Sequence, residues 1–164
     1  MAFIIKSRPL PAAGPTNPGV AVVDQWIHVA KAAATVPQST AAAIFTVRNG
    51  RVLVKALIGE VTTAIGAGTT PDLRVNANPT TGTTYILASD LVIASDEVGT
   101  LYSAEGDGTA LLTVSSGAIT TAIGQGFVVG IGDLEIETSE STTGATKWDV
   151  WYLPLDSTAG VIAA

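Results

Sequence analysis

The chain has 164 residues, no cysteine and a net charge of −6, and only 13% of its side chains are charged. This length predicts one domain with a sizeable core. The lack of cysteine excludes disulfides and thiolate metal sites. No apolar run is long enough to span a membrane, and the net negative charge argues against nucleic acid as the main partner. We therefore expect neither a membrane nor a nucleic acid as a partner.

The charges are distributed unevenly along the chain. Residues 1–82 carry seven basic and three acidic side chains (net +4), whereas residues 83–164 carry one basic and eleven acidic ones (net −10). If the two halves present different surfaces, the domain carries a charge dipole that orients it on a partner. If strands from both halves interleave, no such dipole exists. The sequence leaves both alternatives open.

Residues 1–20 contain four prolines at intervals of a few residues: Pro9, Pro11, Pro15 and Pro18. This spacing is incompatible with a helix or a central strand and favours an extended chain. We therefore expect residues 1–20 to form an extended arm that lies against another surface. The first six residues do not resemble a secretory signal, because their charge follows the apolar residues.

The segment that follows is ambiguous. Asp24 could cap a helix over residues 25–34, where alanines are good helix formers. However, Trp26, His28 and Ala30 alternate with more apolar neighbours, which is typical of a strand. We favour the strand, because the rest of the chain has β character.

Asn49-Gly50 lies between two runs of aliphatic and β-branched residues, which predicts a β-hairpin with a two-residue turn. The predicted cross-strand pairs are Val47 with Val52, Phe45 with Val54, Ala43 with Ala56, and Ala41 with Ile58. All are apolar, so this face should cover the core. The other face carries Arg48, Arg51 and Lys55. Arg48 and Arg51 repel unless a carboxylate lies between them, which makes this tip a candidate docking edge.

Further short strands are predicted over residues 72–78, 83–87, 101–102, 111–114, 126–131, 134–138 and 147–155. About ten strands with regular turn signals predict a single-domain β-sandwich or barrel, with the jelly roll as the leading variant. The sequence thus divides into an extended arm (1–20), a β-sandwich or barrel domain (21–156) and an apolar tail (157–164). The tail contains Val161 and Ile162 and packs on either a neighbour or its own domain. Residues 61–66 (VTTAIG) recur at 119–124 as ITTAIG, by chance or as equivalent strands.

Catalytic chemistry has little support. His28 is the only histidine and no G-x-S-x-G motif occurs, so we interpret it as a strand histidine that is partly packed or at an interface. Asp133, Glu135 and Glu137 alternate along one strand and predict a solvated strand face, although carboxylate pairs also hydrolyse glycosides. Residues 105–108 (EGDG) predict an acidic turn. We expect no enzyme activity, no metal site and no cofactor.

Strand alternation over residues 147–155 separates the aromatic side chains. Trp148 and Tyr152 share one face, which we expect to be core, and Trp151 lies on the other. Trp151 is therefore the candidate for an exposed or interfacial aromatic residue, and such a ring could also stack on a sugar.

Four stretches carry a resemblance to a known family: residues 29–38 (VAKAAATVPQ), 44–54 (IFTVRNGRVLV), 59–63 (GEVTT), and the closing pattern of TTG at 142–144, Lys147-Trp148 and YLPL at 152–155. Together they resemble small structural proteins encoded beside capsid genes in tailed bacteriophages, over most of residues 20–156. The resemblance implies a non-enzymatic capsid decoration (cement) protein on the outside of the phage head, made in the host cytoplasm. It implies as partners the major capsid protein and further copies of the chain, with a homotrimer expected, and it transfers no catalytic residue.

The candidate interface residues are Phe3, Ile4, Ile5, Arg8, Arg48, Arg51, Lys55, Trp151, Val161 and Ile162. We expect the arm and the more basic half to face the capsid or an adjacent copy, with the acidic half outward. The alternative is a receptor- or glycan-binding module of a head fibre or tail, which would use Trp151 and exposed loops. A hydrolase is the weakest candidate.

Overall fold

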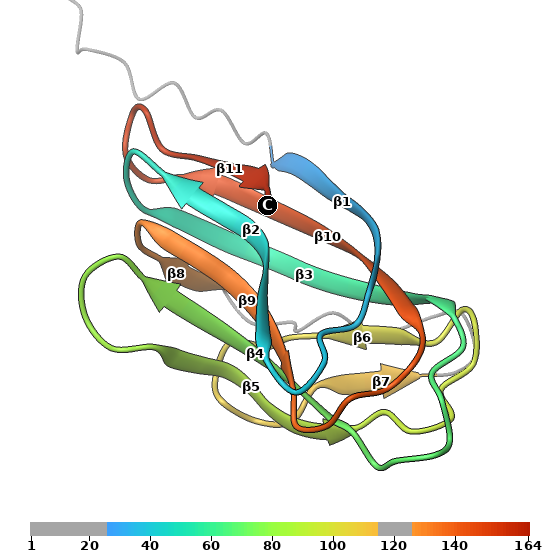
Figure 1. The fold of residues 1–164 in the computed structure, drawn as a ribbon. Coiled ribbons are helices and arrows are strands. Elements are labelled where there is room, and N and C mark those ends of the chain that lie inside the picture. Colours follow the sequence, from blue (N-terminus) through green and yellow to red (C-terminus); the bar gives the residue numbers. More distant parts are fainter. Residues whose placement is uncertain (1–25, 115–125) are drawn as a thin grey trace, which may run out of the picture.

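The computed structural model describes residues 26–114 and 126–164. Within these residues the chain forms eleven β-strands and no helix, as Figure 1 shows. The strands are β1 Ile27–Thr35, β2 Ala41–Arg48, β3 Val52–Thr63, β4 Asp72–Pro79, β5 Tyr85–Val92, β6 Leu101–Ser103, β7 Leu112–Val114, β8 Phe127–Val129, β9 Gly132–Thr138, β10 Ala145–Pro154 and β11 Gly160–Ala163. No helix in the described ranges is long and apolar enough to span a membrane.

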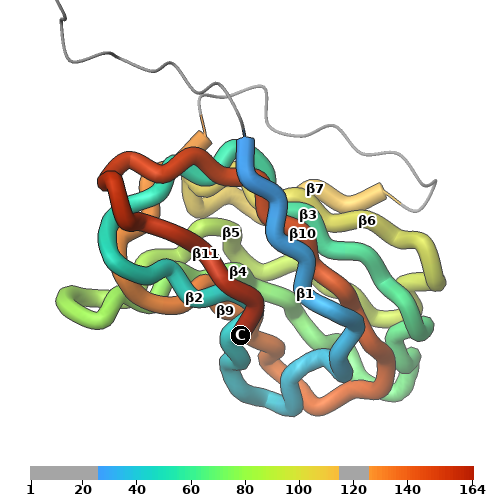
Figure 2. The backbone as a smooth tube through the Cα atoms, turned by 90° about the horizontal axis from the view of Figure 1, so that it is seen from above, coloured from blue at the N-terminus to red at the C-terminus, as the bar shows by residue number. Residues whose placement is uncertain are grey.

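The strands form two antiparallel sheets that pack face to face (Figures 1 and 2). The first sheet has the order β1-β10-β3-β6-β7, and β8 also pairs with β3. The second has the order β11-β2-β9-β4-β5. The predicted single-domain β-sandwich is therefore confirmed, whereas its jelly-roll variant stays a prediction.

The two ends of the described chain lie at one edge of the sandwich. β1 is the edge strand of the first sheet and pairs only with β10 among the described strands, so the strand predicted near residue 27 is confirmed. β11 is the edge strand of the second sheet and pairs with β2. The expected apolar tail is thus largely a strand of the domain itself. The opposite edge is formed by β5 and by β7 and β8.

The predicted hairpin at Asn49-Gly50 is wrong. Both residues have positive φ, 59° and 144°, as a tight turn between them requires. However, β2 lies in the second sheet and β3 in the first, so the turn connects the two layers and the predicted cross-strand pairs do not form. β2 pairs instead with β11 and β9, and β3 with β10, β6 and β8. An Asn-Gly turn fixes the local backbone but not which sheet the next strand joins.

The predicted core face is correct near the turn and wrong further away. Phe45, Val47, Val52 and Val54 are fully buried, but Ala56 and Ile58 are not core residues. The cause is a β-bulge in β3: Val54 pairs with Tyr152 and Ala56 with Trp151, so β3 has one more residue than β10 between these two pairs. That extra residue moves the inward set from even to odd positions. A similar irregularity in β2 precedes Phe45 and exposes Ala41.

Trp148 of β10 belongs to the core and is 1% exposed. Its indole covers Gly59 of β3, where a Cβ atom would lie 2.8 Å from the ring, and its Nε1 donates to Thr146 Oγ1 at 3.0 Å. Tyr102 stacks beside it at 6.4 Å between ring centroids, and its hydroxyl donates to Asp96 at 2.5 Å. Burial raises the pKa of Asp96, opposed by this hydrogen bond.

Candidate interaction surfaces

The β2–β3 turn is held against the loop between β10 and β11. The Arg51 guanidinium donates to both carboxylate oxygens of Asp156 at 3.2 Å, and the Arg51 backbone N–H donates to Asp156 Oδ2 at 2.7 Å. The Thr158 hydroxyl donates to the Asn49 carbonyl at 3.1 Å. The carboxylate expected to relieve the repulsion at this tip is therefore supplied by the chain itself, which removes the original reason to assign Arg51 to a partner.

Replacing Arg51 with alanine is expected to raise the pKa of Asp156 toward its ordinary value. The side-chain hydrogen bond from Arg51 is the largest cause that lowers this pKa, and the backbone hydrogen bond, which alanine keeps, is the next. Because the pKa of Asp156 is lower in the folded than in the unfolded protein, its ionised carboxylate stabilises the fold at a pH above the unfolded-state pKa. This contribution is lost as the pH falls through the folded-state pKa. Carboxyl NMR titration of Asp156 measures the change.

The control for this titration is Asp107, whose pKa is lowered mainly by the hydrogen bond from the Thr109 side chain. Its pKa should stay unchanged in the Arg51→Ala variant. An unchanged pKa of Asp156 would show that the guanidinium does not hold this carboxylate in solution.

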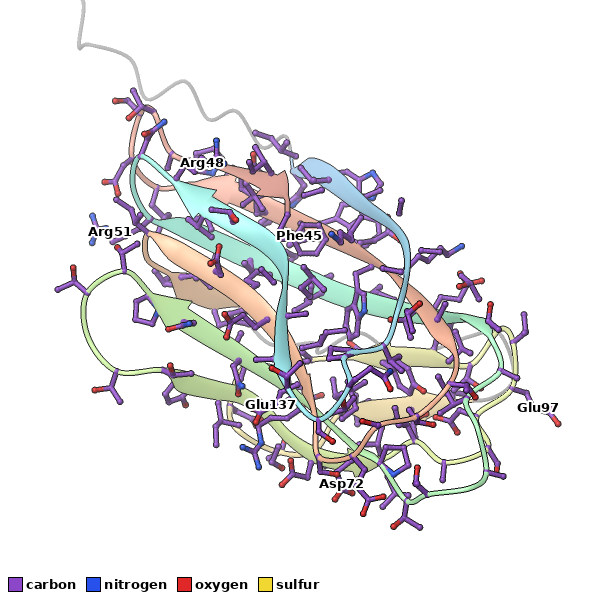
Figure 3. The ribbon with its side chains drawn as sticks, viewed as in Figure 1. Phe45, Arg48, Arg51, Asp72, Glu97 and Glu137 are labelled. Carbon is purple, nitrogen blue, oxygen red and sulfur yellow. The ribbon has the colours of Figure 1, made fainter. Side chains whose placement is uncertain are left out.

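The other two basic candidates of the tip lie apart from this ion pair. Arg48 ends β2, is exposed, and stands opposite Gly160 of β11. Figure 3 shows Arg48 and Arg51 at the same end of the sandwich, with Glu97 at the other end. Lys55 is the extra residue of the bulge in β3 and is exposed on that strand. The fold therefore brings Arg48 and Arg51 to one end but places Lys55 along β3.

Of the two alternatives for the charge distribution, the strand order agrees with the second, because strands of the two halves interleave among the described residues. Acidic β9 lies between β2 and β4, and β10 lies between β1 and β3. Ion pairs accordingly connect the halves: Lys147 with Glu60 at 2.7 Å, Arg74 with Asp90 at 2.9 Å, and Arg51 with Asp156 at 3.2 Å. The basic and acidic halves of the sequence therefore do not form two separate layers in this part of the chain, and the orientation toward a capsid stays a prediction.

The outer face of the first sheet carries an aromatic pair. His28 of β1 stacks on Trp151 of β10 with 4.6 Å between ring centroids, and its Nε2 lies 2.6 Å from Asp149 Oδ1. The His28 side chain is 46% exposed, which agrees with a strand histidine that is partly packed. Trp151 is half-buried on the face opposite Trp148, as the alternation predicts.

The outer face of the second sheet carries the three alternating acids of β9. Leu134 and Ile136 point into the core, so the predicted alternation is confirmed. Asp133 accepts from Thr46, Glu135 from Asn78 and Glu137 from Asn76, at 2.6, 3.1 and 2.9 Å. Over residues 26–114 and 126–164, no three His, Asp or Glu side chains are grouped so as to hold a metal ion.

A pocket opens at the edge of the sandwich formed by β5 and β8, and sequence reasoning did not find it. It has a volume of about 230 Å³, and Tyr85, Leu87, Phe127 and Val128 contribute its apolar walls. Tyr85 is 56% and Val128 57% exposed. A sequence pattern does not reveal such a site, because these residues come from strands far apart along the chain.

A second hollow adjoins this pocket and shares Pro79 and Gly130 with it. It is lined by Arg51 and Asp156 of the tip and by Ile131, which is 45% exposed. One end of the sandwich therefore combines the predicted basic tip with exposed apolar side chains. We call this combined surface, the two hollows with their lining residues, the apolar end.

The remaining candidates fall in three groups. Val161 is 5% exposed and belongs to the core of its own domain, so it is not a contact residue for a partner. Ile162 is 39% exposed on β11 and remains available. Phe3, Ile4, Ile5 and Arg8, like the second VTTAIG-type segment at 119–124, lie outside the described residues.

The fold and these surfaces define a single-domain, antiparallel β-sandwich with an apolar end. No protein-family model matches the chain, and no curated protein matches it. A function for this chain is therefore argued from its own residues.

Proposed function

We propose that this chain is a non-enzymatic structural protein of a tailed-phage virion that decorates and stabilises the outside of the head. Its partners are the major capsid protein and further copies of itself, most simply in a homotrimer. The resemblance of residues 20–156 to small structural proteins encoded beside capsid genes supports this proposal. No cofactor enters it, and the protein acts at the capsid surface after synthesis in the host cytoplasm.

The observation that carries the proposal is the apolar end. Tyr85, Val128 and Ile131 are each between 45% and 57% exposed, and they line two adjoining hollows. Single exposed apolar residues are common on soluble proteins, but several around one concave surface are typical of a site that another molecule covers. The polar rim, with Arg51 and Asp156, matches the usual anatomy of a protein–protein interface.

The sandwich also suits a protein that stabilises a shell. Long-range strand pairing ties both termini of the described chain into the sheets, through β1 and β11. An extended arm ahead of β1 could contact a neighbour through main-chain hydrogen bonds and pockets for alternate side chains, without a deep cleft.

Capsid binding tests the proposal directly. Deleting residues 2–19, or replacing Tyr85 and Val128 with serine, is expected to reduce the occupancy of the protein on expanded capsids to background, because each change removes apolar contact area. The measurement is co-sedimentation with capsids followed by electron microscopy of the particles. The matched control is Val98→Ser, since Val98 is 63% exposed but adjoins Glu97 at the other end of the sandwich (Figure 3).

Unchanged occupancy for both the deletion and the double serine variant would overturn the proposal. The alternative, a receptor- or glycan-binding module, retains one favourable observation. His28, Asp149 and Trp151 place an aromatic pair beside a carboxylate on an open sheet face, and aromatic rings with adjacent hydrogen-bonding groups are suited to sugars. A specific hit on a glycan array that is lost in Trp151→Ala would favour this alternative.

A further inference from the structure

We propose that residues 20–23 of the chain's own arm lie across the outer face of the first sheet, where they cover Leu153, Leu53 and Val128. These three residues are called the outer row below. The inference concerns the isolated protein and goes beyond the proposed function, because it states where the arm leaves the domain. It can fail while capsid binding stands.

The outer row crosses three neighbouring strands, β10, β3 and β8 (Figure 1). Leu153 pairs with Leu53, and Leu53 pairs with Val128. Leu53 lies between Val52 and Val54, which are fully buried, so alternation turns the row away from the core. Val128 is exposed and both leucines are half-buried. The described residues thus leave three large aliphatic side chains in line on an outer face.

The outer faces of the two sheets differ in character. The second sheet carries the acids of β9 on its outer face, as is typical of a sheet face in contact with water. On the first sheet, charged side chains lie further along the strands, where Lys147 pairs with Glu60 at 2.7 Å. The outer row lies toward the end of the sheet at which β1 begins. Aliphatic side chains gathered there indicate a surface that another segment covers.

The described chain begins beside one end of the outer row. Ile27 pairs with Tyr152, and continuing this antiparallel register places Trp26 beside Leu153. Neighbouring strands lie about 4.8 Å apart, so Val128, three strands across from β1, is roughly 14 Å from this point. Residues 20–25 span up to about 20 Å when extended. This length is enough to cross the whole row.

The sequence of residues 20–23 (VAVV) suits this surface. It is the apolar part of the arm nearest to β1, and Asp24-Gln25 provides a short polar connection to Trp26. The apolar residues 3–5 are separated from β1 by about twenty residues, so their docking on the same row would cost more loop-closure entropy. Docking of residues 20–23 removes apolar area from water on both partners. Residues 20–23 are therefore the favoured segment of the arm.

The short connection selects the row of the same chain over that of a second copy. Residues 20–23 are tethered to Trp26 through two residues, and this tether keeps them close to Leu153. A short flexible tether gives an effective concentration in the millimolar range. A second copy would have to compete with this at its free concentration. The isolated protein at micromolar concentration should therefore bind its own segment.

Residues 115–125 are the other segment outside the described residues, and their ends lie to one side of the outer row. They follow Val114, which stands in the cross-strand row of Glu60. They lead to Gly126, which precedes Phe127 in the row of Val54. Both ends are thus on the Glu60 side of the outer row. A direct connection between them does not cross it.

This placement connects two parts of the proposed binding surface. With residues 20–23 over the outer row, residues 1–19 leave the domain at β8. Val128 of β8 also borders the pocket of the apolar end. The part of the arm assigned to capsid binding therefore starts beside the apolar end, and both contact the same region of a partner.

Disulfide trapping tests the placement, because the natural chain has no cysteine. The full chain with Val20→Cys and Val128→Cys, at micromolar concentration with oxidised glutathione, is expected to form an intramolecular disulfide. Intact mass and non-reducing electrophoresis measure its formation. The matched control is Val20→Cys with Ile162→Cys, since Ile162 is exposed on β11, which adjoins β1. The first pair should close about tenfold faster or more, because docking raises the local concentration of the two thiols.

Three outcomes of this experiment would overturn the inference. Equal rates for the two pairs would show an arm that moves freely about its tether. Disulfides only between chains would show that a second copy covers the row. Absence of any disulfide in the first pair would show that residue 20 does not reach Val128.

A hydrophobic dye, 1-anilinonaphthalene-8-sulfonate, provides an independent readout. Serine at all three valines of residues 20–23 is expected to uncover the outer row and to raise dye fluorescence several-fold. Serine at all three of residues 3–5 is the control and should leave it unchanged. An equal rise in both variants, or none in the first, would contradict the inference, provided that both remain folded by circular dichroism. Loss of trapping while the 2–19 deletion still abolishes capsid binding would remove this inference and leave the proposed function in place.

Discussion

Replacing Trp148 with alanine is expected to lower the free energy of unfolding by about 3–5 kcal/mol. Trp148 is 1% exposed and belongs to the main core cluster. Its indole fills the space above Gly59, stacks beside Tyr102 and satisfies its N–H on Thr146. Alanine would leave a large cavity that two rigid sheets cannot close. Urea denaturation, followed by circular dichroism, measures the loss.

Trp151→Ala is the matched control for this prediction. Trp151 lies three residues further along β10 on the opposite face, and its ring is half-exposed against His28. Trp151→Ala should lower the free energy of unfolding by only about 1–2 kcal/mol. The larger loss expected for a buried tryptophan comes from core contacts, which Trp151 does not make. Equal losses for the two variants would contradict the assignment of the two faces of β10.

Replacing Gly132 with alanine is expected to destabilise the protein by more than about 2 kcal/mol, from backbone strain and steric overlap together. Gly132 begins β9 with φ of +148°, a conformation that side chains rarely adopt. A Cβ atom there would lie 2.5 Å from Pro79 Cα and closer still to the Asn78 carbonyl oxygen. Because β9 is the central strand of its sheet, the overlap must move either β4 or β9. Thermal and urea denaturation measure the effect.

Gly130 offers a control two residues earlier. No atom lies within 4 Å of the position that its Cβ would occupy. Gly130→Ala should therefore change the free energy of unfolding by no more than about 0.5 kcal/mol. If Gly132→Ala lowered the free energy of unfolding no more than Gly130→Ala does, β4 and β9 would not be in close contact at Gly132.

The strand content was predictable because it depends on local patterns. Alternating residues at Asp72–Pro79 and Ala145–Pro154 face opposite sides of a sheet whatever the strands pair with. The separation of Trp148 from Trp151 follows from the same alternation. The acid face of β9 was predictable for this reason too, since period two is a property of the strand itself.

The arrangement of those strands was not predictable in the same way. Asn49-Gly50 has the backbone conformation that the sequence indicates, but the strand after it joins the other sheet. Two strands joined by a tight turn pair with each other only if no other strands bury their apolar side chains better. For β3 these partners are β10, β6 and β8, and all three come from later in the chain.

The sequence by itself determined the composition of the layers: a cysteine-free, all-β domain with known inward and outward residues on its regular strands. The tertiary structure decided what these residues face. It placed Asp156 against Arg51, interleaved the basic and acidic halves, and assembled the apolar end from β4, β5, β8 and β9. The physical reason is that alternation and turn chemistry act over a few residues, whereas pairing and packing depend on contacts between residues far apart in the chain.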